Sequence, residues 1–95
     1  MSSNPTGAIA GKVTDGQGEP LPGATITLSG IDNTAPTRVT VSDAEGRYRF
    51  PGLEPGQYEI RVQLEGFTTF DDRNVRVTID NTTIVDAVLT PAHMS

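Results

Sequence analysis

The chain has 95 residues, which suits a single domain, and its seven basic and twelve acidic residues give a formal net charge of −5. The basic residues are scattered along the sequence, which argues against nucleic acid and anionic membrane surfaces, because both require clustered positive charge. No cysteine is present, so disulfides, thiol nucleophiles and cysteine-based zinc sites are excluded. No apolar run approaches the ~20 residues of a membrane span, so membrane insertion is not expected.

Residues 1–7 are small and polar and are predicted to be a linker or a cloning remnant. The folded domain is predicted over residues 8–90, and residues 91–95 are a tail that contains the single histidine, His93. Within the domain, apolar residues recur at every second position, and we expect them to face a core. The alternating sets are Ile9/Gly11/Val13, Ala24/Ile26/Leu28, Val39/Val41, Tyr48/Phe50, Tyr58/Ile60/Val62/Leu64 and Val75/Val77/Ile79, and residues 83–89 form the last strand.

Turn residues separate these runs. Three four-residue windows carry proline second and glycine third, which favours type II turns at residues 21–24, 50–53 and 54–57. Asp15 and Asp43 each begin a further turn that contains a glycine. No window of helical length has an apolar stripe at helical spacing. The sequence therefore predicts an all-β fold, a seven-stranded antiparallel β-sandwich with essentially no helix.

The order of these features is specific. GKVTDGQGEPLPGATITL (residues 11–28) is followed by TVSDAEGRYRFPGLEPGQYEIRV (residues 40–62) and then by Gly66-Phe67. This arrangement resembles the carboxypeptidase regulatory-like domain, a transthyretin-like (prealbumin-like) sandwich related to Cna protein B-type domains. The matched residues suit structural roles: Gly11 permits a close approach to its strand, and Tyr48, Phe50 and Tyr58 supply core area. The motif thus predicts architecture and no catalytic centre.

The resemblance to Cna B-type domains implies one chemical possibility, an isopeptide bond between a core lysine and an Asp or Asn. Lys12, the only lysine, and Asp86 in the last strand are the candidates. Lys12 alternates out of phase with the apolar residues of its strand, and Val62 stands where the assisting acid is expected. We therefore favour a solvated Lys12 and expect Asp86, in an interior setting, to accept a backbone hydrogen bond.

Few residues of the sequence suit a metal site or a catalytic site. Asp71, Asp72 and Asp80, or Asp43 and Glu45, lack the spacing of a calcium loop. Ser42 and Ser29 have no histidine within the predicted domain, so a catalytic triad cannot be assembled. We predict no catalytic residue, no metal site and no cofactor.

Two segments are candidate recognition surfaces for a ligand such as polysaccharide. The loop at residues 30–38 contains Ile31, Asp32, Asn33 and Arg38, and the segment 66–73 contains Phe67 and Phe70. A sugar platform requires exposed flat aromatic rings, and the chain has no tryptophan. Rim packing is the favoured role of the two phenylalanines, and binding through these loops stays open.

The resemblance implies a non-catalytic accessory or spacer module of an exported bacterial protein, located in the periplasm, at the cell surface or outside the cell. Such domains occur beside metallocarboxypeptidases, ahead of TonB-dependent transporters and in adhesins. The expected partners are neighbouring domains of a larger parent chain, with a polysaccharide or a cell-surface protein as alternatives. A further alternative for the function is an isopeptide-stapled surface or pilus module of the Cna B type. We expect a monomer, because charged residues mark the strand edges (Arg38, Arg47, Arg73 and Arg76).

Overall fold

A computed structural model describes residues 5–31 and 36–92, and these contain β-strands and no helix, so nothing among them could cross a membrane as a helix. The strands are β1 (Gly7–Asp15), β2 (Thr25–Gly30), β3 (Arg38–Val41), β4 (Arg47–Leu53), β5 (Gly56–Gln63), β6 (Phe70–Val77), β7 (Thr82–Ile84) and β8 (Ala87–Leu89).

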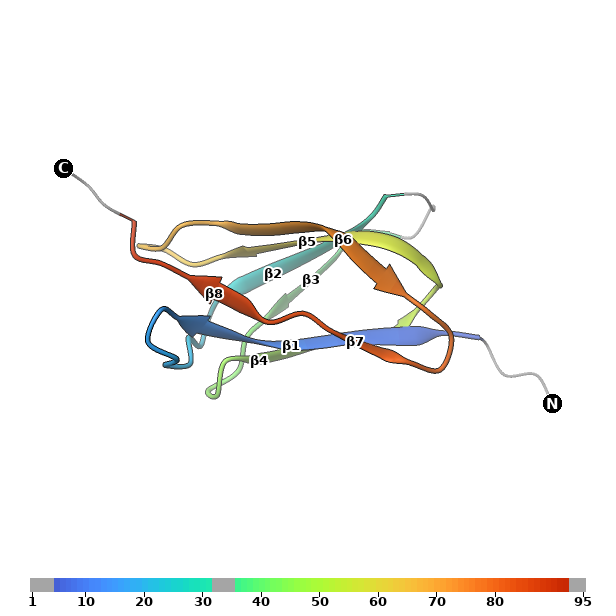
Figure 1. Ribbon diagram of the computed structural model, residues 1–95, viewed down its shortest axis with the longest axis horizontal. Coiled ribbons are helices and arrows are strands. Elements are labelled where there is room, and N and C mark those ends of the chain that lie inside the picture. Colours follow the sequence, from blue (N-terminus) through green and yellow to red (C-terminus); the bar gives the residue numbers. More distant parts are fainter. Residues whose placement is uncertain (1–4, 32–35, 93–95) are drawn as a thin grey trace.

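The strands form two four-stranded sheets that pack face to face (Figure 1). In the first sheet β4 and the pair β7 and β8 flank β1, and the second sheet has the order β3-β2-β5-β6. The predicted all-β sandwich is confirmed. The count of eight rather than seven strands arises because the final predicted strand is interrupted between Ile84 and Ala87.

The core lies between the sheets and is built from the alternating residues that the sequence predicted. Ile9, Ala24, Ile26, Ile60 and Val62, for example, have no measurable exposure. The prediction was wrong for Val39, Val41 and Ile79, whose side chains are 61%, 56% and 48% exposed; Ile79 lies beyond the end of β6. Strand β3 lies at the edge of its sheet, and its half-buried residues Arg38 and Thr40 face inward instead.

The predicted antiparallel arrangement does not hold for the last part of the chain. Both β7 and β8 pair with β1 in parallel, with Ala8 opposite Thr82 and Val13 opposite Ala87. An antiparallel final strand would bring the chain back toward the start of β1. Because the pairing is parallel, the chain enters at one end of the sandwich and leaves at the other (Figure 1).

One of the three predicted Pro-Gly turns is a bulge. Pro51 and Gly52 lie inside β4, where Gly7 pairs with Leu53 and Ile9 pairs with Phe50, so β4 carries one extra residue. Gly52 has a φ of 67°, a left-handed conformation that glycine adopts at little cost. The bulge leaves Leu53 buried in the core.

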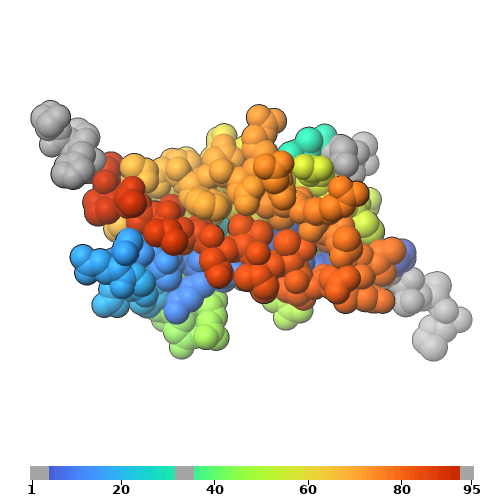
Figure 2. All heavy atoms as spheres, viewed as in Figure 1, coloured from blue at the N-terminus to red at the C-terminus, as the bar shows by residue number. Residues whose placement is uncertain are grey.

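The last third of the chain closes one long side of the sandwich. Thr83 Oγ1 donates to the Arg76 carbonyl oxygen at 2.7 Å, the Thr68 amide donates to the Thr90 carbonyl at 2.8 Å, and the Ala92 amide donates to Gly66 at 2.9 Å. Figure 2 shows the orange and red part of the chain running along this side without a break between the two layers. We call this side the closed edge, and the side where β3 meets β4 the open edge.

Candidate functional site

A cluster of polar contacts lies where the last strand is interrupted, between β7 and β8. The Tyr48 hydroxyl donates to the Val85 carbonyl oxygen, and the Val85 amide donates to the Ala10 carbonyl at 2.9 Å. The Val85 carbonyl oxygen and the Tyr48 hydroxyl lie close to Gly11. A Cβ added at Gly11 would stand 1.8 Å from the Val85 oxygen and 2.8 Å from the Tyr48 hydroxyl. The predicted need for close approach at Gly11 is confirmed. Burial raises the pKa of the Tyr48 phenol far above its ordinary value, so this phenol is a neutral donor.

Asp86 completes this junction from the surface. Its Oδ1 accepts the Lys12 backbone amide at 3.0 Å, which replaces the strand carbonyl that the interruption removes. The expected backbone hydrogen bond is therefore confirmed, but the expected interior setting is wrong, since Asp86 is exposed and Lys12 is half-buried. An isopeptide bond needs apolar surroundings that keep the lysine neutral and the acid protonated, and neither residue has them here.

Other polar side chains of interest serve the backbone. Ser42 is buried, and its hydroxyl accepts from the Ala24 amide at 2.9 Å and donates to the Leu21 carbonyl at 2.7 Å. The Asp43 carboxylate accepts the amides of Glu45 and Arg47, each at 2.9 Å. The Arg47 hydrogen bond contributes most to lowering the pKa of Asp43. Within the described residues, no three acidic or histidine side chains converge as a metal site would require.

The first candidate recognition loop is partly used for structure. Arg38 donates from its two terminal nitrogens to the carbonyls of Pro51 and Gly52 at 2.7 and 3.2 Å, so it ties β3 to the bulge of β4. Ile31 is exposed, while Asp32 and Asn33 lie outside the described residues.

The second candidate segment packs against the core. Phe67 and Phe70 are half-buried and contact the core cluster, as rim packing requires. Phe67 also bridges to Pro91, which holds the chain after β8 against the β5–β6 loop. Neither ring lies open as a flat platform.

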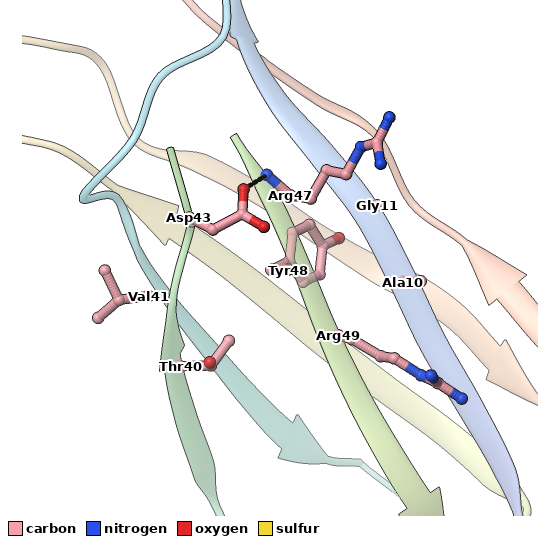
Figure 3. A pocket seen from close by; sticks show the side chains of 8 residues that line it. All are labelled: Ala10, Gly11, Thr40, Val41, Asp43, Arg47, Tyr48 and Arg49. Atoms are coloured by element: carbon pink, nitrogen blue, oxygen red, sulfur yellow. Dashed lines mark hydrogen bonds between the residues drawn. The ribbon is translucent and has the colours of Figure 1, made fainter. Parts of the chain in front are cut away.

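The sequence reasoning missed a basic surface at the open edge. Lys12 stands opposite Arg47, and Ala10 stands opposite Arg49, so these side chains share the outer face of the first sheet. A hollow of about 420 Å³ opens between the two arginines over the Tyr48 backbone and extends to Thr40 and Val41 of β3 (Figure 3). The arginines alternate with core aromatics and Lys12 comes from a distant strand, so only the pairing of β1 with β4 brings them together.

Comparison with known proteins places this architecture in a family. Residues 8–90 match the carboxypeptidase regulatory-like domain family. The chain is also similar to a TonB-dependent transporter, Oar, of Myxococcus xanthus, with 29% identity over 83 residues. That match covers 87% of this chain and 8% of the transporter, so the chain spans a small part of the length of this relative.

Solved structures with the same fold have varied functions. A putative carbohydrate-binding protein from Bacteroides uniformis aligns with a TM-score of 0.73 at 19% identity, covering 93% of this chain and 43% of that one. Catechol 1,2-dioxygenase from an Acinetobacter species aligns with a TM-score of 0.71 at 15% identity, covering 97% and 54%. At such identity these likenesses show the fold alone. The family match over residues 8–90 is decisive: the chain belongs to the carboxypeptidase regulatory-like domain family.

Proposed function

We propose that this domain is a non-catalytic accessory module of an exported bacterial protein, which acts as a rigid spacer or a protein-interaction domain. The observation that carries the proposal is the parallel course of β7 and β8 along β1. A module whose chain enters and leaves at opposite ends separates its neighbours by its own length. The nine residues of β1 alone span roughly 30 Å at the usual rise of a strand.

The closed edge supports rigidity. Hydrogen bonds from Thr83, Thr68 and Ala92 connect the last part of the chain to the second sheet, so the exit point is fixed to both layers. The conspicuous polar residues of the motif, Tyr48 and Asp43, have backbone partners rather than an arrangement suited to catalysis. Similarity to a TonB-dependent transporter supports a location in the bacterial cell envelope.

A glycan-binding role is the alternative. It would use Ile31 and Arg38 with their loop, or Phe67 and Phe70, and it is disfavoured by the internal roles of Arg38 and the two rings. Titration with a broad glycan panel should leave the chemical shifts of residues 30–38 and 66–73 unchanged. A clustered response there would favour glycan binding over the spacer role.

The direct test is to read the source gene outward from both ends of this segment. We expect the frame to continue into a larger domain on at least one side, whose chemistry the module supports. A frame that stops directly after this segment, behind nothing except an export signal, would contradict the spacer role, since there would be no neighbour to hold.

A further inference from the structure

We propose that the open edge binds an extended segment of a partner protein in which acidic and apolar residues alternate. The binding surface, here called the basic groove, consists of Lys12, Arg47 and Arg49, the hollow between the arginines, and the edge of β3 at Val39 and Val41. The proposal rests on the interaction role proposed above and names the surface and the chemistry of the partner.

Charge is distributed unevenly over the molecule. Lys12, Arg47 and Arg49 with the neighbouring Asp43 and Asp86 together carry +1, so the rest of the chain, with a total of −5, carries −6. Among the described residues the ion pairs join Arg61 to Glu59 and Asp71, and none involves the three cations of the groove. A positive face on an acidic protein attracts an acidic partner and repels other copies of the same chain.

The cations also repel one another. Lys12 and Arg47 are directly opposite on adjacent strands, an arrangement that destabilises a sheet unless a counter-charge is supplied. Exposed apolar side chains of β7 and β8, Ile84 and Val88, lie on the same face, opposite Ala10 and Thr14. The face therefore offers contacts for carboxylates and for aliphatic groups together.

The edge of β3 supplies main-chain partners. The Ser42 amide donates to the Ala24 carbonyl at 2.9 Å, which sets the alternation of hydrogen bonds between β2 and β3. In an antiparallel pair this alternation directs the N–H and C=O groups of Thr40 toward β2, and those of Val39 and Val41 toward the free edge. These groups can accept a further strand, and the exposed valine side chains can pack against its apolar residues.

The neighbouring edge of β4 is already blocked on both sides of the hollow. The Arg47 amide and carbonyl are bonded to Asp43, Pro51 has no amide hydrogen, and the Pro51 carbonyl accepts from Arg38. A strand therefore adds to β3 rather than to β4. Val41 and Asp43 line the same hollow as Arg47 and Arg49, whose side chains extend from β4 over β1 (Figure 3). Binding requires the two arginines to turn toward β3, where acidic side chains of the added strand would meet them.

These observations favour a peptide over an acidic polysaccharide. A sugar ring binds best on an exposed aromatic face, and the only aromatic residue of the groove, Tyr48, is buried with its hydroxyl donated to Val85. The open N–H and C=O groups of Val39 and Val41 match the regular spacing of a peptide backbone.

The experiment is a titration of the whole chain with a fluorescein-labelled peptide of alternating valine and glutamate. Saturable binding that weakens between low and high salt is expected, with shifts of the Val39, Val41, Arg47 and Arg49 amides and slower hydrogen exchange at Val39 and Val41. Replacing both arginines, Arg47→Glu with Arg49→Glu, should weaken binding at least about tenfold. The milder pair Arg47→Gln with Arg49→Gln should act in the same direction.

The matched control is Arg73→Glu with Arg76→Glu, two exposed arginines of β6 at the closed edge, which changes the net charge equally. This control should bind as the unchanged protein does. The proposal is overturned if the peptide does not bind, if a valine–lysine peptide binds equally, if both charge-reversed pairs bind alike, or if polygalacturonate competes without protecting Val39 and Val41. Such results leave the spacer role standing, because that role depends on the source gene and not on this titration.

Discussion

The closed and open edges of the same sandwich use their residues in opposite ways. At the closed edge, Val85 and Asp86 are hydrogen-bonded to groups of β1 and β4, and the chain beyond β8 is bonded to the β5–β6 loop. At the open edge, two valines are exposed and three cations form no ion pair among the described residues. Two of the family-motif residues, Gly11 and Tyr48, determine the path of the last strand through their contacts with Val85. Both residues also line the hollow at the open edge, but the Tyr48 hydroxyl is already bonded, so a partner there would contact the arginines and β3 instead.

Gly11→Ala should have the largest effect on the free energy of unfolding. The new methyl group would stand 1.8 Å from the Val85 carbonyl oxygen, so β1 and the last strand would have to separate. We expect a loss of about 3–5 kcal/mol, measured by urea unfolding, or failure to fold. Gly16→Ala is the control, because nothing lies within 4 Å of its added Cβ, and its stability should stay close to that of the unchanged chain.

Tyr48→Phe should have the next largest effect. It removes the donor to the Val85 carbonyl and leaves that buried oxygen without its phenol partner. A loss of ~1–3 kcal/mol is expected, by thermal or urea unfolding. A loss of unfolding free energy below a few tenths of a kcal/mol would mean that this hydrogen bond does not hold the interruption between β7 and β8 in place.

The same residue predicts a dependence on alkaline pH. Burial raises the folded-state pKa of Tyr48, so its contribution to stability is fully present below the unfolded-state value of about 10 and is lost as pH rises above it. Unfolding measured from pH 8.5 to about 11 should show a steeper decline for the unchanged chain than for Tyr48→Phe. Equal slopes would contradict the assignment.

Asp86→Ala should cost about 1 kcal/mol, because it removes the acceptor of the Lys12 amide at a partly hydrated position. Asp86→Asn keeps an oxygen acceptor and should recover most of that stability. The intact mass of the unchanged protein separates this role from an isopeptide bond with Lys12. We expect the full sequence mass, and a mass lower by one water would show the covalent bond instead.

The smallest effect is expected at the open edge. Val39→Thr changes an exposed side chain and should alter stability by less than ~0.5 kcal/mol. The same substitution at the core residue Val62 should cost ~1–3 kcal/mol, because it buries a hydroxyl. Similar losses at both positions would mean that Val39 packs in the core after all.

The part of the fold that local pattern determines was predictable. Tyr58, Ile60 and Val62 face the core because alternation fixes their side within one strand. Val39 and Val41 show the same alternation, but in the edge strand β3 they face solvent, and Arg38 and Thr40 are half-buried instead. Alternation shows that every second side chain lies on the same face of a strand, but it does not show which face is buried. The inference therefore fails at a short edge strand such as β3.

The site was less predictable, because it depends on which strands become neighbours. The parallel pairing of β7 and β8 with β1 brings Asp86 to Lys12, and the pairing of β1 with β4 brings Lys12 to Arg47. These contacts join residues far apart in the sequence, and no local signal marks them. The candidate loops were chosen for exposed polar or aromatic residues, yet Arg38, Phe67 and Phe70 serve the fold.

The central claim, that the domain holds its neighbours apart, depends on the chain leaving at the end opposite to its start. The chain has no cysteine, so spin labels can be placed at Thr6→Cys and Ala92→Cys and their separation measured by pulsed electron paramagnetic resonance. The parallel last strand predicts one narrow distribution at roughly 30 Å or more, the length of β1. A short distance, comparable to the 17–24 Å of the smaller dimensions of the domain, or a broad distribution, would contradict the account.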